Sequence, residues 1–392
     1  MNPAAPEESL PLPSGCEPRC PGCPHRQLSA DASASQKYNW LQTKLASWQD
    51  KLNPLQAVAE EKRWGYRDRV TLACRWLPEL GWQLGMHLKT AWQDEILAIP
   101  GCPLHTPRVN HLMQLLAEHL PCGEDFPLTW LVQAGNQVTL VVKDRKLPDL
   151  HWLSRLENLL QELGYDGLWL HLNPATGKKV LAKKHWQLVW GQPRSLDALG
   201  LIYGPCGFQQ LLPELYQQAL KQAVDFLQPD ADSCVVDFYS GSGASLQHWL
   251  KHQAACIGVE SGGEAVESAA GNAPQASILR GYCRERLPQV ESWVAEQDPD
   301  RQQTRLLYTN PPRIGMEPEV TRWINDSYQP ERLAYLSCSA GTLKRDLEAL
   351  THYRVVSIHP YDFFPQTRHL ETLVLLEKTG CRFRHTRTTD LA

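Results

Sequence analysis

From about residue 195 onward, short apolar runs alternate with segments in which apolar residues recur every three or four positions. The first pattern is typical of buried strands and the second of amphipathic helices. We expect strands at 235–239, 257–260, 277–280, 306–309, 334–337, 355–358 and 372–376, with helices between them, one of them at 263–272. Such alternation predicts an α/β fold with a mostly parallel, doubly wound sheet of seven strands, whose ligand lies at the carboxyl ends of the strands.

The first half of the chain has a different pattern and predicts a smaller α+β unit. Strands are expected at 70–76, 83–87, 128–133, 137–143 and 168–172, and a helix at 150–163. A separate amphipathic helix at 36–52 is a candidate to pack on the second half. We therefore divide the chain into a disordered N-terminus (1–15), an α+β region (16–194), an α/β domain (195–380) and a C-terminal tail (381–392).

Composition narrows the functional classes. The chain has 392 residues, 42% of them hydrophobic, and a formal net charge of −4, so a nucleic-acid partner would need a local basic patch. No signal peptide and no run of roughly 18 apolar residues is present, which favours a cytoplasmic protein that does not contact membranes. We also expect a monomer. The twelve cysteines are then expected to be reduced, metal-bound or catalytic.

Three of these cysteines, Cys16, Cys20 and Cys23, lie in a single eight-residue stretch that is rich in proline and glycine. Such a segment can turn three sulfurs toward one point, as in zinc or iron–sulfur sites, and Cys102 in a Pro-Gly-Cys-Pro turn is the best candidate for a fourth ligand. The spacing does not choose between the two metals. The alternative is a set of unpaired surface thiols.

Two basic stretches are candidates to contact RNA. Arg67 and Arg69 follow Trp64 and Tyr66, and arginine beside aromatic rings suits phosphate contact and base stacking. The second stretch contains Lys183 and Lys184. For the first stretch, the solvated edge of a strand is an equal alternative. For the second, which lies next to Trp186 and Trp190, the alternative is a solvated face, the usual explanation of a run of charges.

Cys338 follows an apolar run and precedes a segment with helical spacing. A side chain at a strand end is exposed over the sheet edge, and a helix N-terminus favours a thiolate, so Cys338 is a candidate nucleophile. The alternative is a small buried hydrophobe.

A glycine-rich turn, Gly241-Ser242-Gly243, follows the first strand of the second half, and Glu260 ends the next one. Glycines let the backbone approach a ligand, and a carboxylate in this place can accept from both hydroxyls of a ribose. Nicotinamide dinucleotides and S-adenosylmethionine both fit. S-adenosylmethionine is favoured because Leu246 replaces the third glycine of the dinucleotide fingerprint and a Pro-Pro turn follows the fourth strand.

Five ordered motifs give the chain a family resemblance: Gly207-Phe-Gln-Gln210, Asp237-Phe-Tyr-Ser-Gly-Ser-Gly243, Asn310-Pro-Pro-Arg313, Tyr335-Leu-Ser-Cys338 with Thr342-Leu-Lys-Arg-Asp346, and Phe364-Pro-Gln-Thr-Arg-His-Leu-Glu371. They resemble those of the S-adenosylmethionine-dependent RNA uracil-5-methyltransferases, the TrmA, RlmC and RlmD group, over residues 16–378. Within it the chain is most similar to RlmC, which acts on 23S ribosomal RNA. The resemblance departs at Leu212, Ser240 and Ser339, which suggests a divergent member.

The resemblance implies a Rossmann-like methyltransferase domain and a set of roles. Cys338 adds to carbon 6 of uracil, and Glu371 removes the carbon 5 proton. S-adenosylmethionine is assigned to Gln210, Tyr239, Gly241, Glu260 and Asn310; Asn310 can also bond the uracil edge, and Arg313 the RNA or its own loop. The four cysteines, Cys16, Cys20, Cys23 and Cys102, are implied to hold a 4Fe-4S cluster. The expected activity is methylation of 23S rRNA at a flipped-out uridine. Alternatives are transfer RNA or another RNA as substrate, or a non-catalytic iron–sulfur RNA-binding paralogue.

Overall fold

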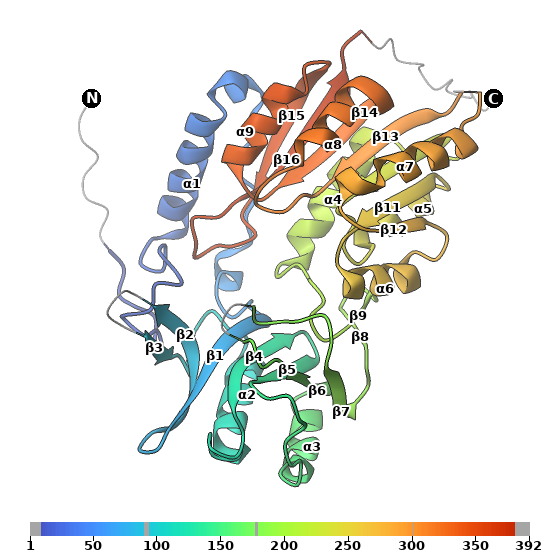
Figure 1. The fold of residues 1–392 in the computed structure, drawn as a ribbon. Helices are drawn as coiled ribbons and strands as arrows, with labels where there is room; N and C mark the ends of the chain where they lie inside the picture. Colours follow the sequence, from blue (N-terminus) through green and yellow to red (C-terminus); the bar gives the residue numbers. More distant parts are fainter. Residues whose placement is uncertain (1–8, 90–93, 177–178, 301, 381–392) are drawn as a thin grey trace, which may run out of the picture.

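Two seven-stranded sheets organise the computed structural model, which describes residues 9–89, 94–176, 179–300 and 302–380. Figure 1 shows the N-terminal sheet with α2 and α3 in the lower part of the molecule and the C-terminal sheet with its helices above it. Residues 1–8 of the N-terminus that we expect to be disordered, and the expected C-terminal tail, 381–392, lie outside the described residues. Leu10, within the range predicted to be disordered, exchanges two hydrogen bonds with Gln27. No helix in the described part of the chain is long and apolar enough to cross a membrane.

The N-terminal sheet has the order β3-β2-β1-β4-β5-β6-β7 and is antiparallel except between β5 and β6. Its elements are β1 (Arg69–Leu77), β2 (Gly81–Lys89), β3 (Asp94–Ala98), α2 (Pro107–His119), β4 (Leu128–Ala134), β5 (Gln137–Val142), α3 (Leu153–Glu162), β6 (Gly167–Leu172) and β7 (Trp186–Gly191). The apolar faces of α2 and α3 pack on this sheet and form one buried cluster with it. The expected α+β character of this half is therefore present, with α2, β3 and β7 as additions.

The C-terminal sheet has the order β12-β11-β10-β13-β14-β16-β15. Its strands are β10 (Ser233–Phe238), β11 (Ala255–Glu260), β12 (Ser277–Arg280), β13 (Thr304–Thr309), β14 (Arg332–Ser337), β15 (Tyr353–Tyr361) and β16 (Glu371–Lys378). All seven predicted strands are present, but the sheet is mixed because β16 runs antiparallel to both of its neighbours. The reversal places the first residue of β16 at the edge where the other strands end.

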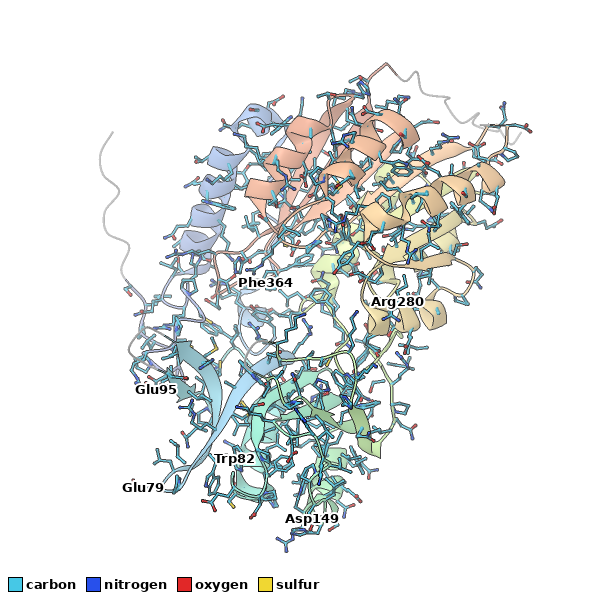
Figure 2. The ribbon with its side chains drawn as sticks, viewed as in Figure 1. Glu79, Trp82, Glu95, Asp149, Arg280 and Phe364 are labelled. Carbon is cyan, nitrogen blue, oxygen red and sulfur yellow. The ribbon has the colours of Figure 1, made fainter. Side chains whose placement is uncertain are left out.

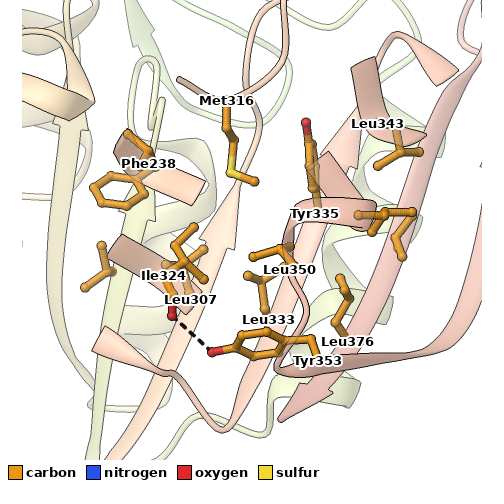
Figure 3. Packing of buried hydrophobic residues seen from close by; sticks show 14 of the residues in the cluster. Phe238, Leu307, Met316, Ile324, Leu333, Tyr335, Leu343, Leu350, Tyr353 and Leu376 are labelled. Atoms are coloured by element: carbon orange, nitrogen blue, oxygen red, sulfur yellow. Dashed lines mark hydrogen bonds between the residues drawn. The ribbon is translucent and has the colours of Figure 1, made fainter. Parts of the chain in front are cut away.

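Helices cover both faces of this sheet, as a doubly wound arrangement requires. They are α4 (Pro213–Leu227), α5 (Ala244–Lys251), α6 (Gly263–Asn272), α7 (Cys283–Gln297), α8 (Pro318–Trp323), which continues into the turn Ile324–Tyr328, and α9 (Ala340–Ala349). One buried cluster contains residues of α7, α8 and α9, and a second contains residues of α4 and α5. Figure 3 shows the first cluster, in which the Tyr353 hydroxyl donates to the carbonyl of Ile324.

The remaining elements join the two sheets: α1 (Ala30–Lys44), the short turns Ala46–Lys51 and Glu60–Lys62, and the hairpin of β8 (Ser195–Leu196) and β9 (Ile202–Tyr203). The predicted helix 36–52 begins earlier, after Ser29 whose side chain accepts from the Ala32 amide, and it stops at Lys44. The backbone leaves helical geometry at Leu45, so the prediction of one helix to residue 52 was wrong. Leu41 and Leu45 are buried in the cluster beside α9, so α1 lies against the C-terminal sheet (Figure 1).

Candidate active site

A cavity of about 1050 Å³ lies between the carboxyl edge of the C-terminal sheet and the N-terminal part of the chain. Residues that directly follow β10, β13 and β14 line it, together with Glu260 at the end of β11 and Glu371 at the start of the reversed β16. Asp68, Arg69 and the Gly135–Asn136 turn close it from the other side. Figure 2 shows Phe364, another lining residue, where the two parts meet.

The cavity brings together nine of the residues singled out from the sequence: Arg69, Gln210, Tyr239, Gly241, Glu260, Asn310, Arg313, Cys338 and Glu371. They come from seven separate segments that span about 300 positions. The cavity lining does not include Arg67, Lys183, Lys184 or the four N-terminal cysteines. The four cysteines and these three basic residues therefore lie outside the cavity.

Strand pairing explains why Cys338 and Glu371 are neighbours. In the antiparallel pair of β14 and β16, Ser337 is opposite Thr372. Cys338 follows the first of these residues and Glu371 precedes the second, so both stand at the same end of the two strands. Glu371 is 5% exposed, and Cys338 is partly buried at the same end of the cavity.

The Cys338 thiol is protonated at neutral pH in this structure. Burial, and then the nearby Glu371 carboxylate, raise the pKa of Cys338 to about 11, while Arg313 opposes the shift. Helix α9 begins at Ala340, two residues after Cys338. The expected contribution of its N-terminus toward a thiolate stays a prediction.

Glu371 is also shifted toward its neutral form. Burial raises its pKa to about 8, with Arg313 again opposing the shift, and one carboxylate oxygen, Oε2, is buried without a hydrogen-bond partner in the described structure. An unpartnered buried carboxyl oxygen that faces a cavity is unfavourable unless a ligand group reaches it. A carboxyl group with a pKa near neutral can hold or release a proton during a reaction.

Arg313 stands on a loop that is fixed by α9. Its Nη2 lies 3.0 Å from Nε2 of His369, and its carbonyl accepts from the Thr342 hydroxyl at 3.2 Å. Two further bonds, from Arg345 Nη2 to the carbonyls of Ile314 and Met316 at 3.0 Å each, hold the following residues. The guanidinium is thus placed beside both the thiol and the carboxyl, where it favours their ionised forms.

The opposite end of the cavity is built from the two loops after β10 and β11. Glu260 Oε2 accepts from the Gly241 amide at 3.2 Å, and Oε1 accepts from the Gly262 amide at 2.6 Å. Tyr239 (φ 58°) is a non-glycine residue in the left-handed region, and its hydroxyl donates to Glu317. The buried Ser240 hydroxyl has no hydrogen-bond partner among the described residues. A carboxylate flanked by backbone amides and an unpartnered hydroxyl fit a ribose and the polar parts of S-adenosylmethionine.

The four candidate metal ligands come from two loops in close contact. The Gly15 backbone, at φ 77°, lies so near the 101–102 turn that a Cβ on Gly15 would come within 2.2 Å of the Gly101 carbonyl oxygen. Cys16, Cys20 and Cys102 each raise the pKa of Cys23 as thiolates, after the larger effect of burial, so the four sulfurs are neighbours. Among the described residues no three His, Cys, Asp or Glu side chains are arranged to hold a single metal ion.

The predicted RNA contacts separate in the structure. Arg69 is half-buried in the cavity wall, with its guanidinium 5.1 Å from the ring centroid of Phe208. Arg67 faces the cysteine loops, since its charge lowers the pKa values of Cys23 and Cys102. Lys183 and Lys184 are exposed in the loop before β7, outside the cavity lining. The nearest of the predicted RNA contacts to the reaction site are therefore Arg69 and Arg313.

Several lining residues were not singled out from the sequence, among them Tyr282, Tyr308 and Glu317. Tyr308 is the penultimate residue of a buried strand, and its hydroxyl has no partner in the described structure. A polar group inside an apolar strand was the available signal. Glu317 lies four residues past Arg313, and nothing local in the sequence distinguishes it from a surface carboxylate.

Comparison with known proteins agrees with this geometry. Residues 294–379, which contain Asn310, Cys338 and Glu371, match the family model of the tRNA (uracil-5-)-methyltransferases. An uncharacterized RNA methyltransferase of Lactobacillus johnsonii is 31% identical over 62% of this chain and 54% of its own length. The 23S rRNA (uracil(1939)-C(5))-methyltransferase RlmD of Enterobacter sp. is 27% identical over 93% of this chain and 83% of its own length.

A solved structure shares the fold. The tRNA (uracil-54, C5)-methyltransferase of Pyrococcus abyssi, in complex with S-adenosyl-L-homocysteine, superposes with a TM-score of 0.69 and 21% identity over 92% of this chain and 86% of its own. The named relatives are RlmD enzymes, whereas the sequence motifs favoured RlmC, a difference within one group. The chain is therefore similar to RNA uracil-5-methyltransferases, in residues 294–379 by the family model and over most of its length by the RlmD relatives.

Proposed function

We propose that the protein methylates carbon 5 of a uridine in 23S rRNA through a covalent adduct on Cys338. The observation that carries this proposal is the placement of a thiol, an unpartnered carboxyl oxygen and a guanidinium at one end of a single cavity. The RlmD relatives favour 23S rRNA as the substrate. Methylation of transfer RNA would keep the chemistry and change the partner.

The reaction requires a nucleophile because carbon 5 of uracil is not reactive enough by itself. Cys338 loses its proton and its sulfur bonds to carbon 6, which makes carbon 5 nucleophilic. S-adenosylmethionine supplies the electrophilic methyl group. Glu371, as the carboxylate, then takes the proton from carbon 5; the electron pair of that C–H bond forms the C5–C6 double bond, and the sulfur leaves carbon 6 as a thiolate.

Arg313 and Asn310 support these steps from the loop after β13. The Arg313 guanidinium favours the charged forms of both Cys338 and Glu371, which the reaction needs in turn. Asn310 lines the cavity at the strand end and can donate to the oxygen on carbon 4 as negative charge develops there. Glu260 and Gly241 would hold the ribose side of S-adenosylmethionine at the other end of the cavity.

A rim of exposed apolar side chains supports RNA as the substrate. Of the ten large hydrophobic residues that are exposed in the described chain, five line this cavity: Leu196, Leu199, Phe208, Tyr282 and Ile314. Aromatic and aliphatic side chains at the mouth of such a site can stack on unpaired bases or fill the space of a flipped one. Ile314 is 71% exposed although its backbone is fixed by Arg345.

Ile314→Ala is expected to weaken binding of a uridine-containing RNA loop by roughly tenfold, since a lost apolar contact of this size contributes about 1 kcal/mol or somewhat more. Leu80→Ala is the matched control, because Leu80 is 69% exposed but lies outside the cavity. It directly follows Glu79, which Figure 2 shows at the far tip of the β1–β2 hairpin. Equilibrium binding at one fixed salt concentration measures both. Equal affinities for the two variants would contradict an RNA contact at Ile314.

We also propose that Cys16, Cys20, Cys23 and Cys102 hold a 4Fe-4S cluster away from the reaction site. Arg26 would support the loop, since its guanidinium donates to the carbonyls of Cys20 and Pro18. The cluster would join two loops of the N-terminal half. No step of the methyl transfer needs it.

Cys16→Ser is expected to abolish the absorbance near about 400 nm and most of the bound iron after anaerobic purification. Cys122→Ser is the control, because Cys122 is a partly buried thiol of the same half that bonds Asp125 instead. Iron and sulfide analysis, with the visible spectrum, distinguishes the two. Unchanged iron in Cys16→Ser, or bound zinc in place of iron, would contradict this ligand set.

The proposed methylation of 23S rRNA is tested with methyl-tritiated S-adenosylmethionine. Incorporation of label into 23S rRNA is measured, and the labelled nucleoside is then identified. 5-Methyluridine is the expected product. Another methylated nucleoside would contradict the proposal. Label found only in transfer RNA would mean that transfer RNA, and not 23S rRNA, is the substrate.

A further inference from the structure

The loop 362–370, which leads directly into Glu371, is held from outside by the N-terminal half of the chain. It connects β15 to β16, and it contains the buried residues Asp362, Phe363 and Gln366. The amide of Asp362 donates to the Gln56 carbonyl at 2.8 Å, and the His25 amide donates to the Gln366 carbonyl at 3.1 Å. These partners precede the loop by more than 300 positions in the sequence.

Lys37 makes the most complete of these contacts. Its side chain, on α1, is 0% exposed, and its Nζ lies 2.6 Å from Asp362 Oδ1. The same ammonium donates to the carbonyls of Phe364 at 3.0 Å and Pro365 at 3.1 Å. All three donor positions of the ammonium are therefore used on one four-residue stretch of this loop, 362–365. A buried ammonium with three directed bonds fixes the backbone that it contacts.

A second polar residue of α1 contacts the same stretch. The Ser33 hydroxyl, one helical turn before Lys37, donates to the Pro365 carbonyl at 3.2 Å and is itself 2.9 Å from Nδ1 of His25. Ser33 and Lys37 thus lie on one face of α1, and both are buried. The buried face of α1 therefore makes polar contacts with the loop in addition to its apolar packing.

Apolar packing also holds this loop, since Phe363 and Leu370 are buried in the two core clusters of the C-terminal half. Within it, Thr367 and Asp362 make local bonds to residues two or three positions away. Toward the cavity, His369 Nε2 lies 3.0 Å from Arg313 Nη2. Glu371 is the first residue of β16 and is paired with Tyr361, the last residue of β15, so the loop 362–370 joins the two strand ends at the reaction site.

We propose that Lys37 is a positioning residue for the general base: by holding residues 362–365, it keeps the Glu371 carboxylate directed at carbon 5 of the adduct. This inference rests on the proposed function, because Glu371 must act as the base. Lys37 does not touch the reacting atoms. It is predicted to affect proton removal and leave addition of Cys338 largely intact.

The test separates these two steps in the full-length protein with its RNA and S-adenosylmethionine. Release of tritium from carbon 5 reports proton removal, and an RNA–protein complex that survives denaturation reports the adduct. Lys37→Met is expected to lower the rate of tritium release at least tenfold while the adduct accumulates, the pattern expected of Glu371→Gln. Ser33→Ala, a milder change, is expected to shift the ratio of the two signals in the same direction.

Arg305→Met is the matched control for loss of a buried ion pair. Arg305 bonds the 2%-exposed Asp298 carboxylate at 3.1 Å, near the start of β13 and so at the opposite edge of the sheet. It should retain the wild-type ratio of released tritium to adduct even if it lowers stability. Should Lys37→Met fail to fold, Ser33→Ala still decides the question.

An unchanged ratio in Ser33→Ala and Lys37→Met, or loss of adduct in proportion to loss of release, would overturn the role of Lys37. Failure of the wild-type protein to give either signal would instead overturn the proposed function. The two failures are therefore distinguishable.

Discussion

Replacing Cys338 with alanine is expected to abolish methyl transfer, with a loss of at least about three orders of magnitude, as is usual when a covalent nucleophile is removed. Carbon 5 of uracil would then remain unactivated, because Cys338 is the only cysteine among the described residues that line the cavity. Incorporation of label from methyl-tritiated S-adenosylmethionine into RNA measures the loss. The alanine is small enough to leave the edge of β14 and the start of α9 unchanged.

Cys206→Ala is the matched control, since Cys206 is a partly buried thiol of the same half that does not line the cavity. It should keep full activity. Binding of S-adenosylmethionine should survive in Cys338→Ala, because the residues assigned to it lie at the other end of the cavity. Appreciable residual methylation by Cys338→Ala would rule out the adduct mechanism.

Glu371→Gln is expected to stop the reaction one stage later. The amide is isosteric but cannot take the carbon 5 proton, so the methylated adduct cannot release Cys338. Turnover should fall by roughly 10²- to 10⁴-fold, the usual contribution of a general base. A covalent RNA–protein complex should accumulate, detectable on a denaturing gel.

The pH dependence of the same step follows from the raised pKa of Glu371, about 8. Below this pH the group is mostly protonated and cannot act as a base, so tritium release should rise with pH and level off above about 8. The Cys338 pKa of about 11 gives addition a dependence of the same sign. In Glu371→Gln, adduct formation should still rise with pH while the step near pH 8 disappears. A rate that falls from pH 6 to pH 8 would contradict both assignments.

The sequence alone predicted those parts of the fold that depend on the local pattern of apolar and polar residues. The apolar runs before Tyr239, Asn310 and Cys338 identified strands, and the residues after them line the cavity because parallel strands end at one edge. The reversal of β16 has no local signal: its apolar run would look the same in either direction. Its consequence, Glu371 beside Cys338, came only from the family resemblance.

Long-range burial explains what the sequence did not reveal. The pKa of Cys338 depends first on how deeply the thiol is buried and then on Glu371, and neither is visible in the local sequence. Helix α1 was extended to residue 52 because Trp48 and Leu52 continue its apolar spacing, yet the chain turns at Leu45 to follow the surface of β15. The local sequence does not reveal that Lys37 is buried, because its partner Asp362 lies 325 positions later in the chain.

The most direct test is release of tritium from 23S rRNA labelled at carbon 5 of uridine, with S-adenosylmethionine, by the wild-type protein and by Cys338→Ala. Methylation at carbon 5 must displace that hydrogen, and the displacement must pass through the Cys338 adduct. Release by the wild type that is absent in Cys338→Ala is the predicted result. Methyl transfer to RNA without release of tritium, or equal release by both proteins, would contradict it.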